Sequence, residues 1–211
     1  SYLTKDQCLS WLKNSKTLTF EAGARFLRPD QLTDSIFFIR AGKVRCLGID
    51  PFGGGQVTIS IDGEGSFYGW LSLLRAEPSE FVQCSTEVEL IALPADIFIS
   101  YFSSSPQFAN YFTSKTSIFE IYGVASSLIL NSTYRDIDFE KYLLSGKFKS
   151  SAHSFDLSSK SHFIEPPEGY LWHLSTPNIP NISVGSIIKS TDLPFEGISG
   201  FKLPYRLVLL P

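Results

Sequence analysis

The sequence predicts a mainly β protein with flanking helices, in which a β-domain over residues 1–125 precedes a β-rich extension over residues 126–211. Short runs of β-branched and aromatic residues alternate with turn residues between positions 17 and 93. Strands at this spacing are typical of a β-sandwich or a β-barrel. After Pro94 the apolar residues instead recur at helical spacing. We therefore expect a β-domain closed by helices, with a second unit appended to it.

A short amphipathic helix is expected to open the chain. Thr4 and Gln7 have the spacing of a capping box, in which each side chain bonds to the backbone of the other residue. The apolar residues that follow fall on one face of a helix: Cys8, Leu9, Trp11 and Leu12. We expect this face to pack on the β-domain.

Five β-type segments come next, at residues 18–20, 24–27, 35–49, 56–61 and 80–93. Gly42 interrupts the longest of them and predicts a hairpin turn. A longer turn is predicted where three consecutive glycines follow Asp50, Pro51 and Phe52. These glycines lack the Lys-Ser or Lys-Thr pair and the helix of a phosphate-binding loop, which disfavours that interpretation.

Two helices are expected after the last strand. The first covers residues 95–102, and the second begins with Ser105 as N-cap and Pro106 as its first residue. Gly123 is expected to end this helix. Before it, a largely aromatic stripe recurs at three- and four-residue steps: Phe108, Tyr111, Phe112, Lys115, Ile118, Phe119 and Tyr122. Such a stripe is typical of core packing, and a homodimer contact through residues 106–122 is the alternative.

The extension is expected to contain a helix and irregular β-structure. Gly146 predicts the end of a helix over residues 136–145. β-type runs at residues 169–175 and 182–188 follow in a stretch rich in serine and proline. The sequence of this extension, expected to be a helix plus an irregular β-rich unit, contains no recognisable internal repeat.

The composition excludes several classes of function. The sequence has 18 Lys and Arg residues against 21 Asp and Glu residues, which gives a net charge of −3. A net charge this close to zero does not indicate a nucleic-acid or anionic-membrane partner. Cys8, Cys46 and Cys84 form no C-x-x-C pair, so we expect reduced thiols. No stretch approaches the ~18 apolar residues of a membrane span, and no secretory signal opens the chain. We therefore expect a cytoplasmic chain without direct membrane insertion.

No catalytic or metal-binding motif is present. The sequence has no H-E-x-x-H, G-x-S-x-G, Walker or Rossmann pattern. His153, His162 and His173 lack the short spacing of metal ligands, although a metal-dependent enzyme using all three is an alternative. We expect a protein that is not an enzyme and holds neither metal nor cofactor.

Three segments in order resemble the cyclic nucleotide-binding domain family. Residues 20–23 read FEAG, residues 34–44 read DSIFFIRAGKV, and residues 65–69 read GSFYG and lead to LIALP at 90–94. The family pattern is F-x-x-G, then D-x-(I/L)-(Y/F)-F-I-x-x-G-x-V, then G-x-x-F-G-E. The resemblance covers residues 1–124 and implies a cyclic-nucleotide-binding-like β-roll, which is a double-stranded jelly roll.

Two ligand contacts of that family are absent. Its glutamate, which binds the ribose 2′-hydroxyl, is replaced by Trp70, and its arginine, which binds the cyclic phosphate, by Pro78. Each lost contact is worth about 1.5–3 kcal/mol, so the resemblance implies binding weakened by about 3–6 kcal/mol, or ~10² to 10⁴ in affinity. Glu80 adds a negative charge near the phosphate position, and Arg75 is a nearby cation that could substitute.

The candidate pocket follows from the same resemblance. In the family, a short helix after the third motif cradles the cyclic phosphate with its free N–H groups. The residues at the corresponding positions are Phe67, Gly69, Trp70, Leu71, Ser72, Pro78, Ser79 and Glu80. A cyclic nucleotide is a possible but disfavoured ligand of this pocket.

We therefore expect a non-catalytic regulatory or interaction module that has lost its usual ligand contacts. The alternative is a genuine sensor of a small ligand or cyclic nucleotide with a rebuilt pocket, in which Trp70 offers a stacking face. A transcription factor of this family would carry a basic helix-turn-helix after residue 125, but that stretch has eight basic and eight acidic residues.

The expected partners are other domains of a longer chain or a separate protein. Residues 170–175, 184–187 and 205–211 resemble the region that follows such a domain in bacterial ATP-binding-cassette (ABC) exporters with an N-terminal peptidase. The absence of methionine and the apolar run at 207–211 also suggest a piece of a longer protein.

Overall fold

The computed structural model describes residues 5–131, 152–155, 163–177, 179, 181–192 and 205–210. The chain forms two compact units. The first contains Ser1–Gly48 and Gln56–Thr113, and the second contains Ile49–Gly55 and Ser114–Pro211. Residue 125, where we expected the domain boundary, lies inside a helix of the second unit.

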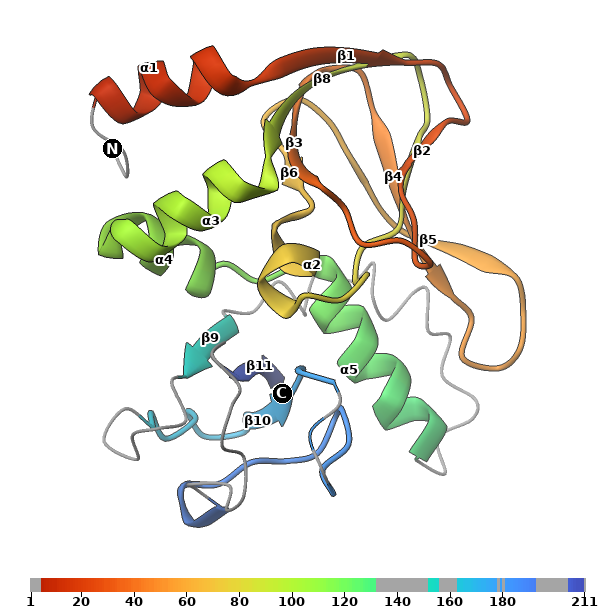
Figure 1. Cartoon of the computed structure of the whole chain (residues 1–211). Coiled ribbons are helices and arrows are strands. Elements are labelled where there is room, and N and C mark those ends of the chain that lie inside the picture. Colours follow the sequence, from red (N-terminus) through yellow and green to blue (C-terminus); the bar gives the residue numbers. More distant parts are fainter. Residues whose placement is uncertain are drawn as a thin grey trace. The chain divides into compact units, whose positions relative to one another are not determined.

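Two antiparallel four-stranded sheets build the first unit (Figure 1). One has the order β1 (Lys16–Phe20), β8 (Val88–Pro94), β3 (Ser35–Ala41) and β6 (Phe67–Tyr68). The other has the order β2 (Arg25–Leu27), β7 (Val82–Cys84), β4 (Val44–Ile49) and β5 (Gln56–Asp62). This arrangement confirms the predicted fold class, mainly β with flanking helices.

Alternating residues of these strands form the core. The side chains of Ile39, Val44, Cys46 and Leu90 are fully buried. Gly42 makes the predicted turn between β3 and β4 with φ +93°, and a Cβ there would lie 2.2 Å from the carbonyl oxygen of Glu87. Only glycine combines this backbone conformation with so close an approach.

Four helices flank the sheets of the first unit: α1 (Lys5–Asn14), α2 (Trp70–Arg75), α3 (Ala95–Ser104) and α4 (Pro106–Thr113). The predicted opening helix is α1. Its Trp11 ring meets that of Phe108 on α4 edge to face, with 5.8 Å between the centroids. Phe108 and Phe112 are both buried, as expected for a core-packing stripe.

The single helix predicted from residue 106 to 122 is wrong, because the chain forms two helices there. The first ends at Thr113, and α5 runs from Ile118 to Asn131. A capping box starts α5: the Ser117 N–H donates to the Glu120 carboxylate at 3.1 Å, and the Phe119 N–H donates to the Ser117 hydroxyl. Gly123 lies inside α5 and does not end it.

The second unit contains a three-stranded antiparallel sheet in the order β10 (Leu171–Leu174), β11 (Tyr205–Leu210) and β9 (Ala152–Phe155). Its core consists of Trp172, Leu174, Ile179, Ile188, Leu207 and Leu209. The predicted β-run at 182–188 makes only isolated bridges and precedes a short 3-10 helix, η2 (Ser190–Asp192). The helix predicted over 136–145 lies outside the described residues.

The tip of the β4–β5 hairpin belongs to this second unit. There the hydroxyl of Tyr122 on α5 donates a hydrogen bond to the carbonyl oxygen of Ile49. Among the described residues, no helix has the length and apolar character needed to cross a membrane.

Candidate ligand-binding site

The candidate site is organised around Gly69, which immediately precedes α2. Its φ is +92°, and a Cβ there would lie 2.6 Å from the carbonyl oxygen of Ser35. The glycine therefore lets β6 turn directly into α2 while passing close to β3. This turn leaves the Gly69 N–H and the first N–H groups of α2 without partners from the helix itself.

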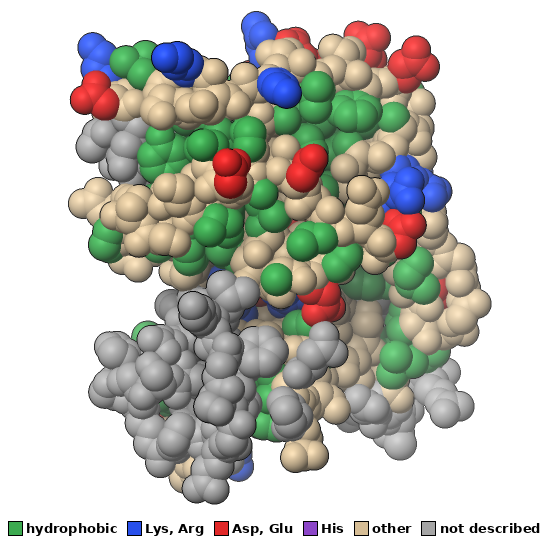
Figure 2. Space-filling view, viewed as in Figure 1, with side chains coloured by type: hydrophobic (Ala, Val, Ile, Leu, Met, Phe, Trp, Pro, Cys, Tyr) green, Lys and Arg blue, Asp and Glu red, His purple; other side chains and the backbone are tan. Residues whose placement is uncertain are grey.

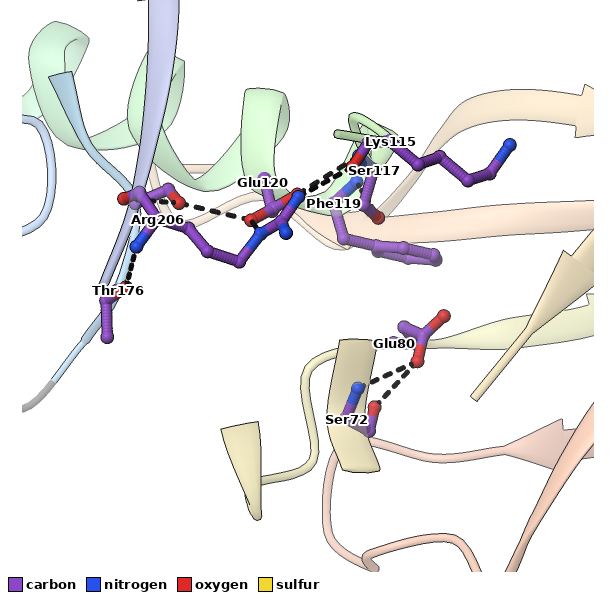
Figure 3. Close-up of polar contacts among 9 residues, drawn as sticks. Ser72, Glu80, Lys115, Ser117, Phe119, Glu120, Thr176 and Arg206 are labelled. Atoms are coloured by element: carbon purple, nitrogen blue, oxygen red, sulfur yellow. Dashed lines mark hydrogen bonds and ion pairs between the residues drawn. The ribbon is translucent and has the colours of Figure 1, made fainter. Parts of the chain in front are cut away.

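A carboxylate of the chain itself accepts these N–H groups. Glu80 is 2% exposed, and its Oε1 accepts the Gly69 N–H at 2.9 Å. Its Oε2 accepts the N–H of Ser72 at 3.0 Å and the Ser72 hydroxyl at 2.9 Å (Figure 3). The Ser79 N–H in turn donates to the Ser72 hydroxyl at 3.1 Å. Gly69, Ser72, Ser79 and Glu80 thus belong to one hydrogen-bond network.

Opposing effects act on the ionisation of Glu80. Burial raises its pKa, because the charged form loses its hydration. Hydrogen bonds from the Ser72 and Gly69 N–H groups and from the Ser72 hydroxyl, and then the charge of Arg75, oppose that rise. Arg75, which the sequence suggested as a substitute phosphate ligand, thus acts on Glu80.

The other predicted pocket residues lie elsewhere around α2. Trp70 is 2% exposed, and its ring centroid lies 5.7 Å from that of Phe112, so its indole is part of the core. Leu71 is fully buried, and Pro78 is half-buried. Phe67 stacks on Tyr111 of α4. The structure therefore separates an aromatic group, Phe67 and Trp70, from the polar network around Glu80.

A second polar cluster, which the sequence did not indicate, lies between β4, β5 and β6. One carboxylate oxygen of Asp62 accepts hydrogen bonds from the hydroxyls of Ser60, at 3.2 Å, and Tyr68. The buried Cys46 thiol lies 3.3 Å from the Tyr68 hydroxyl. Burial, with further contributions from the negative charges of Asp62 and Glu80, raises the pKa of Cys46 to about 12. This thiol is therefore protonated and unreactive at neutral pH.

The second unit has its own buried polar group. Arg206 on β11 donates from Nε to Oε1 of Glu120 and from Nη2 to Oε2, the latter at 3.0 Å (Figure 3). The side chains are 3% and 0% exposed. Glu120 also accepts from the Ser175 hydroxyl at 3.2 Å, and Arg206 donates to the Lys115 carbonyl. This fork fixes the start of α5 to the central strand of the sheet.

The histidines do not converge in the described part of the chain. His173 is buried, with its Nδ1 2.9 Å from the Gly185 carbonyl oxygen, and burial lowers its pKa. His153 lies on β9, and His162 falls outside the described residues. No group of three or more His, Cys, Asp or Glu side chains suited to a metal ion occurs within the described residues.

Several solved structures are similar to this chain. The catabolite activator protein of Thermus thermophilus is 22% identical with a TM-score of 0.46, covering 69% of this chain and 62% of that one. A cyclic nucleotide-binding domain from Methylobacillus flagellatus is 18% identical with a TM-score of 0.45, covering 52% and 62%. A cyclic nucleotide-binding-like protein from Brucella abortus is 22% identical with a TM-score of 0.42, covering 48% and 86%.

This chain thus spans less than two thirds of the length of the first two structures. A search of the curated proteins finds no match. Residues 17–105 match the family described as the cyclic nucleotide-binding domain, and the two-sheet β-roll with its flanking helices has the fold that this resemblance implied.

Proposed function

We propose that the first unit is a non-catalytic regulatory or interaction module in which Glu80 takes the place of a nucleotide phosphate. The observation that carries this proposal is the occupation of the Gly69 and Ser72 N–H groups by the buried Glu80 carboxylate. A carboxylate and a phosphate are both anionic oxygen acceptors for N–H groups at the start of a helix. The chain therefore satisfies internally the donors that a cyclic phosphate would need.

Electrostatics supports the same proposal. Burial raises the pKa of the Cys46 thiol, and Asp62 and Glu80 add smaller contributions in the same direction, so acidic side chains already act on the interior of the β-roll. A cyclic nucleotide would bring a further negative charge and would also have to displace Glu80 from three hydrogen bonds. These costs add to the ~10² to 10⁴ loss of affinity from the absent glutamate and arginine.

The setting of the module is a further part of the proposal. We place it in the cytoplasm, as the part of a longer protein such as an ABC exporter that contacts neighbouring domains or a protein partner. The resemblance of residues 170–175, 184–187 and 205–211 to such exporters supports this setting. A homodimer is the alternative assembly, although Phe108 and Phe112 of the contact expected through residues 106–122 are buried within the first unit. Light scattering of the purified chain distinguishes a monomer from a dimer.

Isothermal titration calorimetry of the full chain with cyclic AMP and cyclic GMP tests the central claim. We expect no binding at micromolar concentrations. Binding of either nucleotide at micromolar affinity or tighter would refute the loss of the ligand site and favour the alternative of a rebuilt sensor.

Two variants distinguish the effect of the missing arginine on cyclic AMP affinity from the effect of the Glu80 carboxylate. Pro78→Arg restores a phosphate ligand at a half-buried position, and Pro78→Arg with Glu80→Ala also frees the N–H groups. We expect the double variant to bind cyclic AMP at least about tenfold more tightly than Pro78→Arg alone. Equal affinities of the two variants would show that Glu80 does not block the site.

A further inference from the structure

We propose that the first unit binds a small uncharged aromatic molecule in an apolar cavity on the outer face of the sheet that contains β3 and β8. The cavity has a volume of about 340 Å³. Its walls come from α1, through Cys8 and Trp11, and from α4, through Phe108 and Tyr111. It is distinct from the network around Glu80, since neither Glu80 nor Ser72 lines it.

The floor of the cavity follows from the register of the strands. Ile36 lies opposite Leu93, and Phe38 lies opposite both Ile91 on β8 and Phe67 on β6. Because side chains on a strand alternate between faces, these residues share the face opposite to Phe37 and Ile39. β3 and β8 are therefore apolar on both faces, whereas an antiparallel sheet commonly presents polar residues on its outer face.

Charged residues limit this apolar floor at one end. The next residues on the same face, Arg40 and Glu89, form an exposed ion pair with 2.7 Å between Nη1 and Oε1. The row formed by Ile91, Phe38 and Phe67 is incompletely covered, because Phe38 is 39% exposed and the other two are half-buried. Figure 2 shows hydrophobic side chains gathered along the underside of α1.

The lining determines which ligand chemistry fits. None of the lining residues is charged, and most of them are aromatic. A charged ligand would lose its hydration without gaining an ionic partner, which is unfavourable. Aromatic rings favour planar partners in stacked or edge-to-face contact, as Phe67 and Tyr111 already stack at 5.9 Å. A cavity of this volume lies at the lower end of the range for small-molecule sites, which points to a compact planar ligand.

The uncharged fluorophore N-phenyl-1-naphthylamine tests this proposal by titration into the full chain. We expect saturable fluorescence enhancement below roughly 100 µM probe. Ile91→Trp replaces an aliphatic side chain of the lining with a bulkier indole ring, which fills part of the cavity and should weaken binding at least about tenfold. The matched control is Ile61→Trp, at a 60% exposed isoleucine outside the cavity, which should leave binding unchanged.

Alkylation of Cys8 gives a second readout that needs no substitution. Cys8 is exposed and lines the cavity, whereas Cys46 and Cys84 are buried with pKa values raised by burial. Labelling by monobromobimane should therefore report Cys8, and saturating probe should slow it at least about threefold. The proposal is overturned by an absence of saturable binding, by equal binding to both tryptophan variants, or by unprotected labelling of Cys8. These results are independent of the calorimetry with cyclic nucleotides.

Discussion

Replacing Glu80 with glutamine tests whether the buried carboxylate holds α2 in place. Glutamine keeps the shape of the side chain but offers one acceptor oxygen and an NH2 group. Either the Gly69 N–H or the donors of Ser72 must then face that NH2 group, since Glu80 accepts from both sides. An unpaired buried donor costs about 1–3 kcal/mol.

Relief of the buried charge offsets part of this cost, because burial is the largest cause of the raised pKa of Glu80. We therefore expect Glu80→Gln to lower the free energy of unfolding by about 1–2 kcal/mol at neutral pH, measured by urea denaturation. Glu64→Gln, at an exposed position, is the matched control and should change stability by less than about 0.5 kcal/mol. Equal stability of the two variants would refute a structural role for the carboxylate.

Two further predictions concern the second unit. Arg206→Met leaves the Glu120 carboxylate buried without its ionic partner and should lower the free energy of unfolding, measured by urea denaturation, by about 3–5 kcal/mol. Adding Glu120→Gln to the same chain should recover part of this loss, and a loss below about 1 kcal/mol for Arg206→Met alone contradicts the prediction. Burial lowers the pKa of His173 from its ordinary 6.5, so the unfolded chain binds the proton more readily. This contribution to stability should be complete above pH 6.5 and be lost as the pH falls towards the lowered pKa. His173→Gln should remove that pH dependence, and an unchanged pH profile would contradict the assignment.

Local sequence signals predicted most of the β-roll. Gly42 and the alternating residues around it are sufficient to predict the β3–β4 hairpin, because turn chemistry and side-chain period act over a few residues. The break before α5 also has a local signal, since Ser117 and Glu120 have capping-box spacing. The helical spacing of the aromatic residues continues across residues 114–117, so it predicted one uninterrupted helix in spite of the capping-box spacing.

The site was only partly predictable, because its contacts depend on the tertiary fold. The sequence placed Glu80 near the phosphate position as a repulsive charge, whereas the carboxylate turns onto the Gly69 and Ser72 N–H groups. The ion pair of Glu120 with Arg206 joins residues 86 positions apart, and no local pattern marks it. The apolar residues on both faces of β3 are a local sequence pattern from which an apolar surface outside the core could have been predicted.

The hydrogen bond from Tyr122 to Ile49 bears on how the protein should be divided for laboratory expression. A fragment that stops at Thr113 contains every strand of the β-roll but removes α5 from the β4–β5 hairpin tip, leaving the Ile49 carbonyl without its tyrosine. A fragment that includes α5 but omits β11 instead leaves Glu120 without Arg206. Expression of all 211 residues therefore preserves both contacts.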